Sequence, residues 1–137
     1  CGFNSFRHYA GGNLAGWSHA GYMPRIRERF GLDPGRMPFD FTEVLAAIAP
    51  RAVLVVAPLR DANFPVEGVY VCRDAARPGY ALLDAEVALR FDHPDCEHDF
   101  PPESRRAAYA WLDRWLAPPA SDSAVESPRP AQASPSM

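Results

Sequence analysis

The run Ala52-Val53-Leu54-Val55-Val56-Ala57 decides the fold that this sequence predicts. It is short, continuous and rich in β-branched residues, which is typical of a strand buried on both faces of a parallel sheet. A second strand is predicted over Glu86 to Phe91. Between them, Val66 to Leu83 has a mostly helical pattern, in which Pro78-Gly79 predicts a break. The succession of strand, helix and strand predicts an α/β fold with a parallel sheet.

Further helices are predicted on both sides of this unit. Asp40 stands where an N-cap belongs, and an apolar stripe at helical spacing follows it until Pro50 ends the helix. In the last predicted helix, Glu103 to Leu116, apolar residues recur at intervals of three and four. Three upstream segments complete the pattern: a long loop over 1–21, a short helix over 22–30 and a turn over 31–38.

Two strands are too few for the predicted fold, because two strands alone cannot form a stable sheet whose faces are both covered by helices. The chain also begins at Cys1, in a loop-like stretch, rather than at Met. We therefore interpret residues 1–116 as the C-terminal part of a larger α/β domain. Residues 117–137 are rich in Pro and Ser and poor in large apolar residues, which predicts a disordered tail.

Charge and composition exclude several classes of function. The net charge of −3 and the pI of about 5.8 give no electrostatic basis for binding nucleic acid or an anionic membrane. No apolar run approaches the roughly 20 residues that span a bilayer. The three cysteines have no regular spacing and form no CxxC, so neither a disulfide framework nor a structural zinc site is predicted. Reduced thiols slightly favour a cytoplasmic setting, and no pattern indicates an oligomeric state.

Two residues that could carry chemistry follow the two predicted strands. Asp61 comes directly after the first strand, and His98 lies 37 residues later, after the second. Adjacent parallel strands would bring the two loops side by side, where a carboxylate could orient an imidazole that acts as a general base. The alternatives are an Asp61 that is solvated or paired with Arg60, and a His98 that is an ordinary surface histidine.

The sequence around these residues resembles the C-terminal part of α/β-hydrolases. The likeness lies in Met37 to Arg51, the following strand, the Asp61 loop and the run Glu97-His98-Asp99-Phe100-Pro101. It is strongest to the branch of dienelactone hydrolases, acetyl xylan esterases and prolyl-oligopeptidase-like enzymes. In that family the acid follows the seventh strand and the histidine the eighth, positions that Asp61 and His98 match. The resemblance implies a serine hydrolase, most simply a carboxylic-ester hydrolase, that needs no cofactor or metal.

The sequence departs from the family in lacking a nucleophile. The family places its serine in a Gly-x-Ser-x-Gly turn between a strand and a helix, and this pentapeptide does not occur here. Ser5 and Ser18 are poor substitutes, because neither is predicted in such a turn. We therefore expect the serine and the oxyanion-hole loop to lie upstream of Cys1, and the 137-residue chain alone to be inactive.

A small-molecule ester is the expected substrate. Trp17, Tyr22 and Asn63 are the candidate substrate contacts, because aromatic and amide side chains above a hydrolase site could bind an acyl group or a sugar. The alternative for the aromatic residues is a loop that folds over its own aromatic cluster.

The second loop admits a different interpretation, as a metal site. Six potential ligands crowd it: Asp92, His93, Asp95, Cys96, His98 and Asp99. Their spacing matches no standard motif, and Pro94 restricts the backbone between them.

A third interpretation is a non-catalytic remnant of a hydrolase, or an interaction module. A chain without a nucleophile, with an incomplete sheet that exposes an edge, would suit association with another chain.

Overall fold

The centre of the molecule is a pair of parallel strands joined by one long helix. Strand β1 (Val53–Val56) pairs with β2 (Leu89–Asp92), and helix α3 (Val66–Leu82) connects them, as the computed structural model shows over its described residues, 2–117. The register places Val53 opposite Leu89 and Val56 opposite Asp92. This arrangement confirms the predicted α/β fold and its parallel strand pair.

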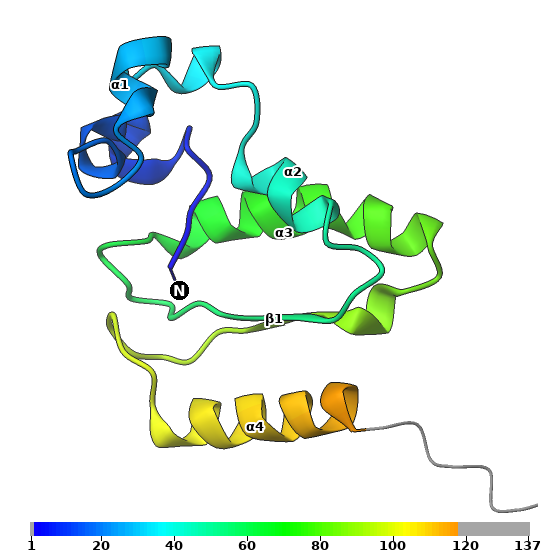
Figure 1. The fold of residues 1–137 in the computed structure, drawn as a ribbon. Helices are drawn as coiled ribbons and strands as arrows, with labels where there is room; N and C mark the ends of the chain where they lie inside the picture. The colour runs from blue at the N-terminus through cyan, green and yellow to red at the C-terminus, as the bar shows by residue number, and fades with distance from the viewer. Residues whose placement is uncertain (1, 118–137) are drawn as a thin grey trace, which may run out of the picture.

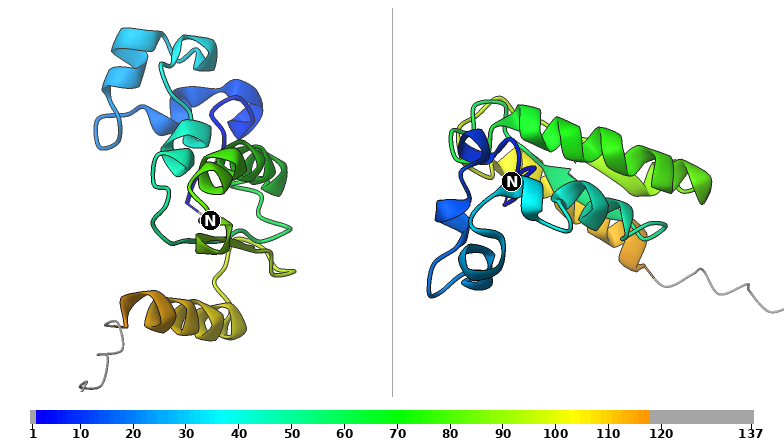
Figure 2. Two further views of the ribbon diagram at one scale, coloured as in Figure 1. Left: turned by 90° about the vertical axis from the view of Figure 1, so that its right-hand side faces the viewer. Right: turned by 90° about the horizontal axis from the view of Figure 1, so that it is seen from above.

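Helices cover both faces of the strand pair. Helix α3 and the short α2 (Phe41–Ala46) pack together on one face, and α4 (Pro102–Leu116) lies on the other (Figures 1 and 2). Along α3, the buried side chains recur every three or four residues, as one helix face requires. They include Val66, Val69, Cys72, Ala76 and Tyr80. Both faces of the strands are therefore covered, which explains the continuous apolar run in β1.

The break predicted at Pro78 is wrong, because α3 runs through it without interruption. Proline removes the hydrogen bond that an amide would make to the carbonyl of Asp74, and its ring crowds that carbonyl. Asp74 and Pro78 both lie on the exposed face of α3, where water can satisfy that carbonyl. Buried Ala76 and Tyr80 anchor the helix on either side of the proline.

The second strand starts three residues later than predicted. Residues Glu86–Ala88 form a 3₁₀ turn, in which Val87 is 70% exposed. Pairing begins only at Leu89, because that residue meets Val53, the first residue of β1. The length of β1 therefore sets the start of β2.

Residues 2–37 fold around an aromatic centre. Most of the predicted long loop is irregular, with 3₁₀ turns at Tyr9–Gly12 and Leu14–Trp17. Helix α1 (Arg25–Phe30) begins later than the predicted residue 22, because Met23 has a positive φ of 43° that no α-helix accommodates. The predicted turn over 31–38 contains a 3₁₀ turn at Pro34–Arg36.

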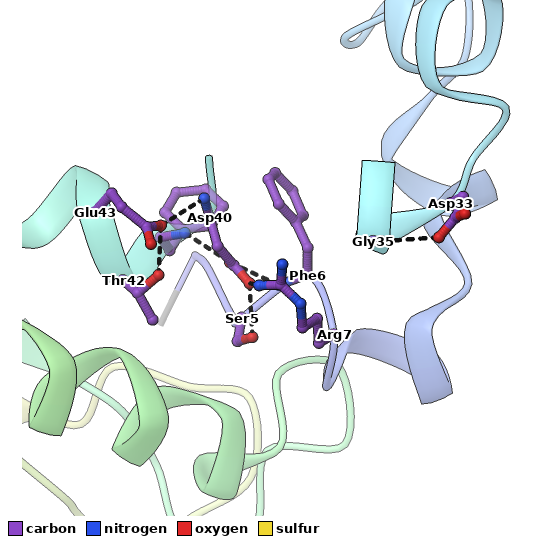
Figure 3. Close-up of polar contacts among 9 residues, drawn as sticks. Ser5, Phe6, Arg7, Asp33, Gly35, Asp40, Thr42 and Glu43 are labelled. Atoms are coloured by element: carbon purple, nitrogen blue, oxygen red, sulfur yellow. Dashed lines mark hydrogen bonds and ion pairs between the residues drawn. The ribbon is translucent and has the colours of Figure 1, made fainter. Parts of the chain in front are cut away.

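Asp40 is the predicted N-cap of α2, and it also fixes the N-terminal segment. Its carboxylate accepts hydrogen bonds from the Phe41 and Phe6 amides at 2.6 and 2.8 Å and from the Ser5 hydroxyl at 2.9 Å (Figure 3). The Glu43 side chain accepts in return from the Asp40 amide, which completes a capping box. One buried carboxylate therefore starts α2 and ties residues 5–7 to it.

The predicted tail, 117–137, lies outside the described residues apart from Ala117. Within residues 2–117, no helix combines the length and apolar character needed to cross a membrane.

Candidate active site

The loops that follow β1 and β2 lie side by side because the pairing of the strands continues beyond their ends. Three backbone hydrogen bonds join the loops: Ala57 N to Asp92 O (2.9 Å), Leu59 N to Pro94 O (3.0 Å) and Arg60 N to Cys96 O (3.1 Å). The exposed Arg60 side chain adds a hydrogen bond to the Asp95 carbonyl at 3.1 Å and an ion pair with its carboxylate at 3.4 Å. The loops therefore emerge at the same end of the sheet with a fixed offset.

Asp61 is buried at the start of a tight turn. Its Oδ1 accepts hydrogen bonds from the backbone amides of Asn63 and Phe64, at 2.9 and 3.0 Å. Its Oδ2 accepts from Nδ1 of His98 at 2.8 Å. Burial alone would raise the pKa of Asp61, but the hydrogen bonds from His98 and the two amides outweigh it and hold the pKa below its ordinary value. Asp61 is therefore an ionised, oriented acceptor near neutral pH.

His98 has one ring nitrogen committed and one left for chemistry. An ionised carboxylate only accepts, so Nδ1 carries the hydrogen that is donated to Asp61 and Nε2 of the neutral ring is a proton acceptor. The side chain is 50% exposed, whereas that of Asp61 is fully buried. An oriented imidazole with a buried carboxylate behind it is the arrangement used for general-base catalysis.

The ring of His98 packs against Phe64, which is itself held by aromatic residues of the N-terminal segment. The Phe64 ring lies 5.8 Å from the His98 ring, centroid to centroid, and also packs against Tyr9 and Trp17, at 5.9 and 6.3 Å. Residues far apart in the sequence thus fix the surroundings of His98. Phe64 is visible in the sequence as an aromatic residue three positions after Asp61, but its partners Tyr9 and Trp17 come from a segment without periodicity.

The three residues predicted to contact a substrate have different settings. Trp17 is only 3% exposed and packs among other rings, so it offers little surface to a ligand. Tyr22 is 45% exposed, with its ring 6.0 Å from that of Trp17. Asn63 is exposed, and its backbone amide donates a hydrogen bond to the Asp61 carboxylate. The aromatic residues thus form the cluster that was the alternative interpretation, with Tyr22 at its surface.

The potential metal ligands of the second loop point to separate partners. Asp92 pairs with Arg90, while Asp95 pairs with Arg60. The Asp99 carboxylate accepts from the amide of Phe100. Nowhere among residues 2–117 do three or more His, Cys, Asp or Glu side chains gather as a cation would require. The donor geometry gives a divalent metal ion no site in this loop.

The described residues contain three serines, and all are buried: Ser5, Ser18 and Ser104. Ser5 donates to Asp40. The Ser18 hydroxyl donates to the Met23 carbonyl at 3.1 Å and accepts from the Arg27 amide at 3.0 Å, which ties the loop to α1. The structure therefore brings together an acid and a histidine, whereas its described serines are buried, and Ser5 and Ser18 are held in hydrogen bonds within the fold.

Two solved structures resemble this fold. The chain is similar to a carbohydrate esterase family 15 glucuronoyl esterase from Caldicellulosiruptor kristjansonii, with 25% identity and a TM-score of 0.62. The match covers 82% of this chain and 33% of that esterase, so the chain spans a third of its length. The match to methylesterase BT1017 has 28% identity and a TM-score of 0.48, and covers 55% of this chain and 17% of that one.

The glucuronoyl esterase supports an α/β-hydrolase fold. Neither a family model nor a curated protein matches the sequence. The fold assignment therefore rests on the structural likeness and on the parallel strand pair.

Proposed function

We propose that this chain supplies the acid, Asp61, and the general base, His98, of a carboxylic-ester hydrolase. The observation that carries the proposal is the 2.8 Å hydrogen bond between a buried carboxylate and a half-exposed imidazole, on neighbouring loops at one end of a parallel sheet. The likeness to a glucuronoyl esterase gives independent support. The nucleophile in this proposal is a serine outside the described residues.

In the first step, the serine hydroxyl attacks the ester carbonyl while Nε2 of His98 takes its proton. The imidazolium that forms is stabilised by the Asp61 carboxylate, which stays ionised. His98 then gives the proton to the departing alcohol oxygen, and an acyl-enzyme remains.

In the second step, water attacks the acyl-enzyme while Nε2 again accepts a proton. Returning that proton to the serine oxygen releases the carboxylic acid and restores the starting state. Each catalytic cycle therefore consumes one ester and one water molecule, without a cofactor.

The substrate in this proposal is a small-molecule ester, and the enzyme belongs to the branch of dienelactone hydrolases, acetyl xylan esterases and prolyl-oligopeptidase-like enzymes. Tyr22 and Asn63 expose their side chains and are proposed to contact it. Trp17 is proposed to act through Tyr22, against which its ring packs.

The test is hydrolysis of p-nitrophenyl acetate by the complete protein. His98→Ala should lower kcat/KM by about 10³-fold or more, because it removes the general base. Asp61→Asn should lower it by a similar factor, because the imidazole loses the carboxylate that orients it.

The matched controls are His8→Ala and Asp74→Asn, which remove an exposed histidine and an exposed carboxylate on α3. Their rates should stay within about twofold of the wild type. Full activity in the His98→Ala protein would reject the proposal, and inactivity of a folded wild type towards a panel of esters would favour the interaction module.

A further inference from the structure

The strand ladder that positions the two loops has a gap in its hydrogen bonding at Pro94. Continuing the register places Ala57 opposite His93. In a parallel ladder, a residue donates to the residue before its partner and accepts from the residue after it. Ala57 does donate to Asp92 at 2.9 Å, but its carbonyl faces Pro94, which has no amide hydrogen.

The side chain of His93 supplies the missing donor. Its Nδ1 lies 2.9 Å from the Ala57 carbonyl oxygen. A carbonyl can only accept, so the hydrogen resides on Nδ1. The imidazole thus takes the place of the backbone amide that Pro94 lacks. Beyond this point the ladder resumes, with Leu59 donating to the Pro94 carbonyl at 3.0 Å.

The ring of His93 is held in place from two sides. Tyr70 of α3 meets it edge-on with centroids 5.0 Å apart, and Phe91 stacks on it at 6.3 Å with an interplanar angle of 23°. Its Nε2 is buried and has no hydrogen-bond partner among the described residues. These contacts orient the ring so that only Nδ1 serves the ladder.

We infer that His93 is a positioning residue for the proposed active site, which acts by replacing the hydrogen bond lost at Pro94. It lies five residues before His98, and its acceptor, Ala57, lies four residues before Asp61. Without this bond, the loops can slide relative to each other where they leave the sheet. This inference rests on the proposed function, because the positioned pair is the proposed acid and base.

The experiment uses four variants of the complete protein. His93→Leu removes the donor, and His93→Asn keeps an N–H close to the position of Nδ1. Pro94→Ala restores a backbone amide, and the double variant His93→Leu/Pro94→Ala has that amide in place of the ring. His8→Leu, at an exposed position, is the matched control.

The first measurement is steady-state ester hydrolysis. His93→Leu should lower kcat by about 10- to 100-fold with little change in KM, because misplaced catalytic groups slow the chemical step. His93→Asn and the double variant should recover to within about threefold of the wild type, and Pro94→Ala and His8→Leu should match it.

The second measurement does not depend on activity. In the His93→Leu protein, the Leu59 and Arg60 amides should exchange with solvent about tenfold faster, and the Nδ1 proton of His98 should lose its NMR signal through exchange. Both should return in the double variant.

Unchanged kcat and unchanged exchange in His93→Leu would overturn the inference, as would a double variant that recovers neither. If His93→Leu does not fold, recovery in His93→Asn and the double variant supports the inference, and failure of both overturns it. Should His98→Ala retain activity, the proposed function fails, and the exchange measurement still decides whether His93 holds the ladder.

Discussion

Gly68 in helix α3 is a position where one added methyl group should destabilise the protein severely. A Cβ there would lie 1.6 Å from Oδ1 of Asn4 and 2.8 Å from Cβ of His8. The Asn4 side chain is completely buried and donates to the Pro65 carbonyl at 2.7 Å. Gly68 is therefore where the N-terminal segment packs directly on the backbone of α3.

The size of the effect follows from what Asn4 would have to do. Its amide would need to retreat by about 1.4 Å to reach even the 3.0 Å limit for such contacts. That movement would break its bond to Pro65 and leave buried polar groups unpaired, at a cost of about 1–3 kcal/mol. Overpacking adds about 1–3 kcal/mol, and the better helix propensity of Ala returns about 1 kcal/mol. We expect Gly68→Ala to lower the free energy of unfolding by about 3 kcal/mol.

The assay is urea unfolding of the complete protein, followed by circular dichroism. Gly79→Ala is the matched control in the same helix, because its Cβ would meet Ala46 at 3.7 Å, an ordinary contact. The control should gain up to about 1 kcal/mol from helix propensity. In an Asn4→Ala background, Gly68→Ala should cost much less. A Gly68→Ala protein as stable as the control would refute the reasoning.

Three more predictions concern the loops and the core. Arg60→Ala should change the free energy of unfolding by less than about 1 kcal/mol in a urea titration, because its ion pair is exposed. The pKa of Asp61 is lower in the folded protein than its ordinary value of 3.8. The ionised carboxylate should therefore stabilise the fold fully above pH 3.8, and this contribution should be lost as the pH falls through the pKa of the folded state. In pH-dependent urea unfolding, the difference in free energy of unfolding between wild type and Asp61→Asn should shrink in acid. Burial raises the pKa of Cys72 to about 12, so peptide mass spectrometry should find this thiol unlabelled by iodoacetamide at pH 8 until the protein unfolds, and rapid labelling of the native protein would contradict this.

The parallel strand pair and the meeting of Asp61 with His98 follow from local sequence patterns. The apolar run of β1 and the helical pattern of α3 leave one simple arrangement, in which both strands end at the same edge. Asp61 and His98 lie in the two loops that leave the sheet at that edge, so the sequence predicts that they come close together. Their contact at 2.8 Å agrees with that expectation.

The details that the sequence did not reveal depend on contacts between distant segments. Pro78 reads locally as a helix breaker, and its tolerance depends on which face of α3 meets the core. The support that Phe64 gives His98 involves Tyr9 and Trp17, which lie in a stretch without periodicity. The role of His93 becomes visible only once the register of the two strands is known.

Asp61 and His98 belong to one contiguous stretch, a strand–helix–strand unit and the loop that follows it, which has a consequence for recombination with related sequences. A chimera with its junction before residue 53 inherits both partners from one parent, together with the ladder that sets their spacing. A junction inside α3 instead takes them from different parents, and their contact then depends on two unrelated loops having matching lengths. We therefore expect this stretch to be transferable as one unit. Libraries of recombined sequences should keep the contact between Asp61 and His98 far more often when the stretch is exchanged whole.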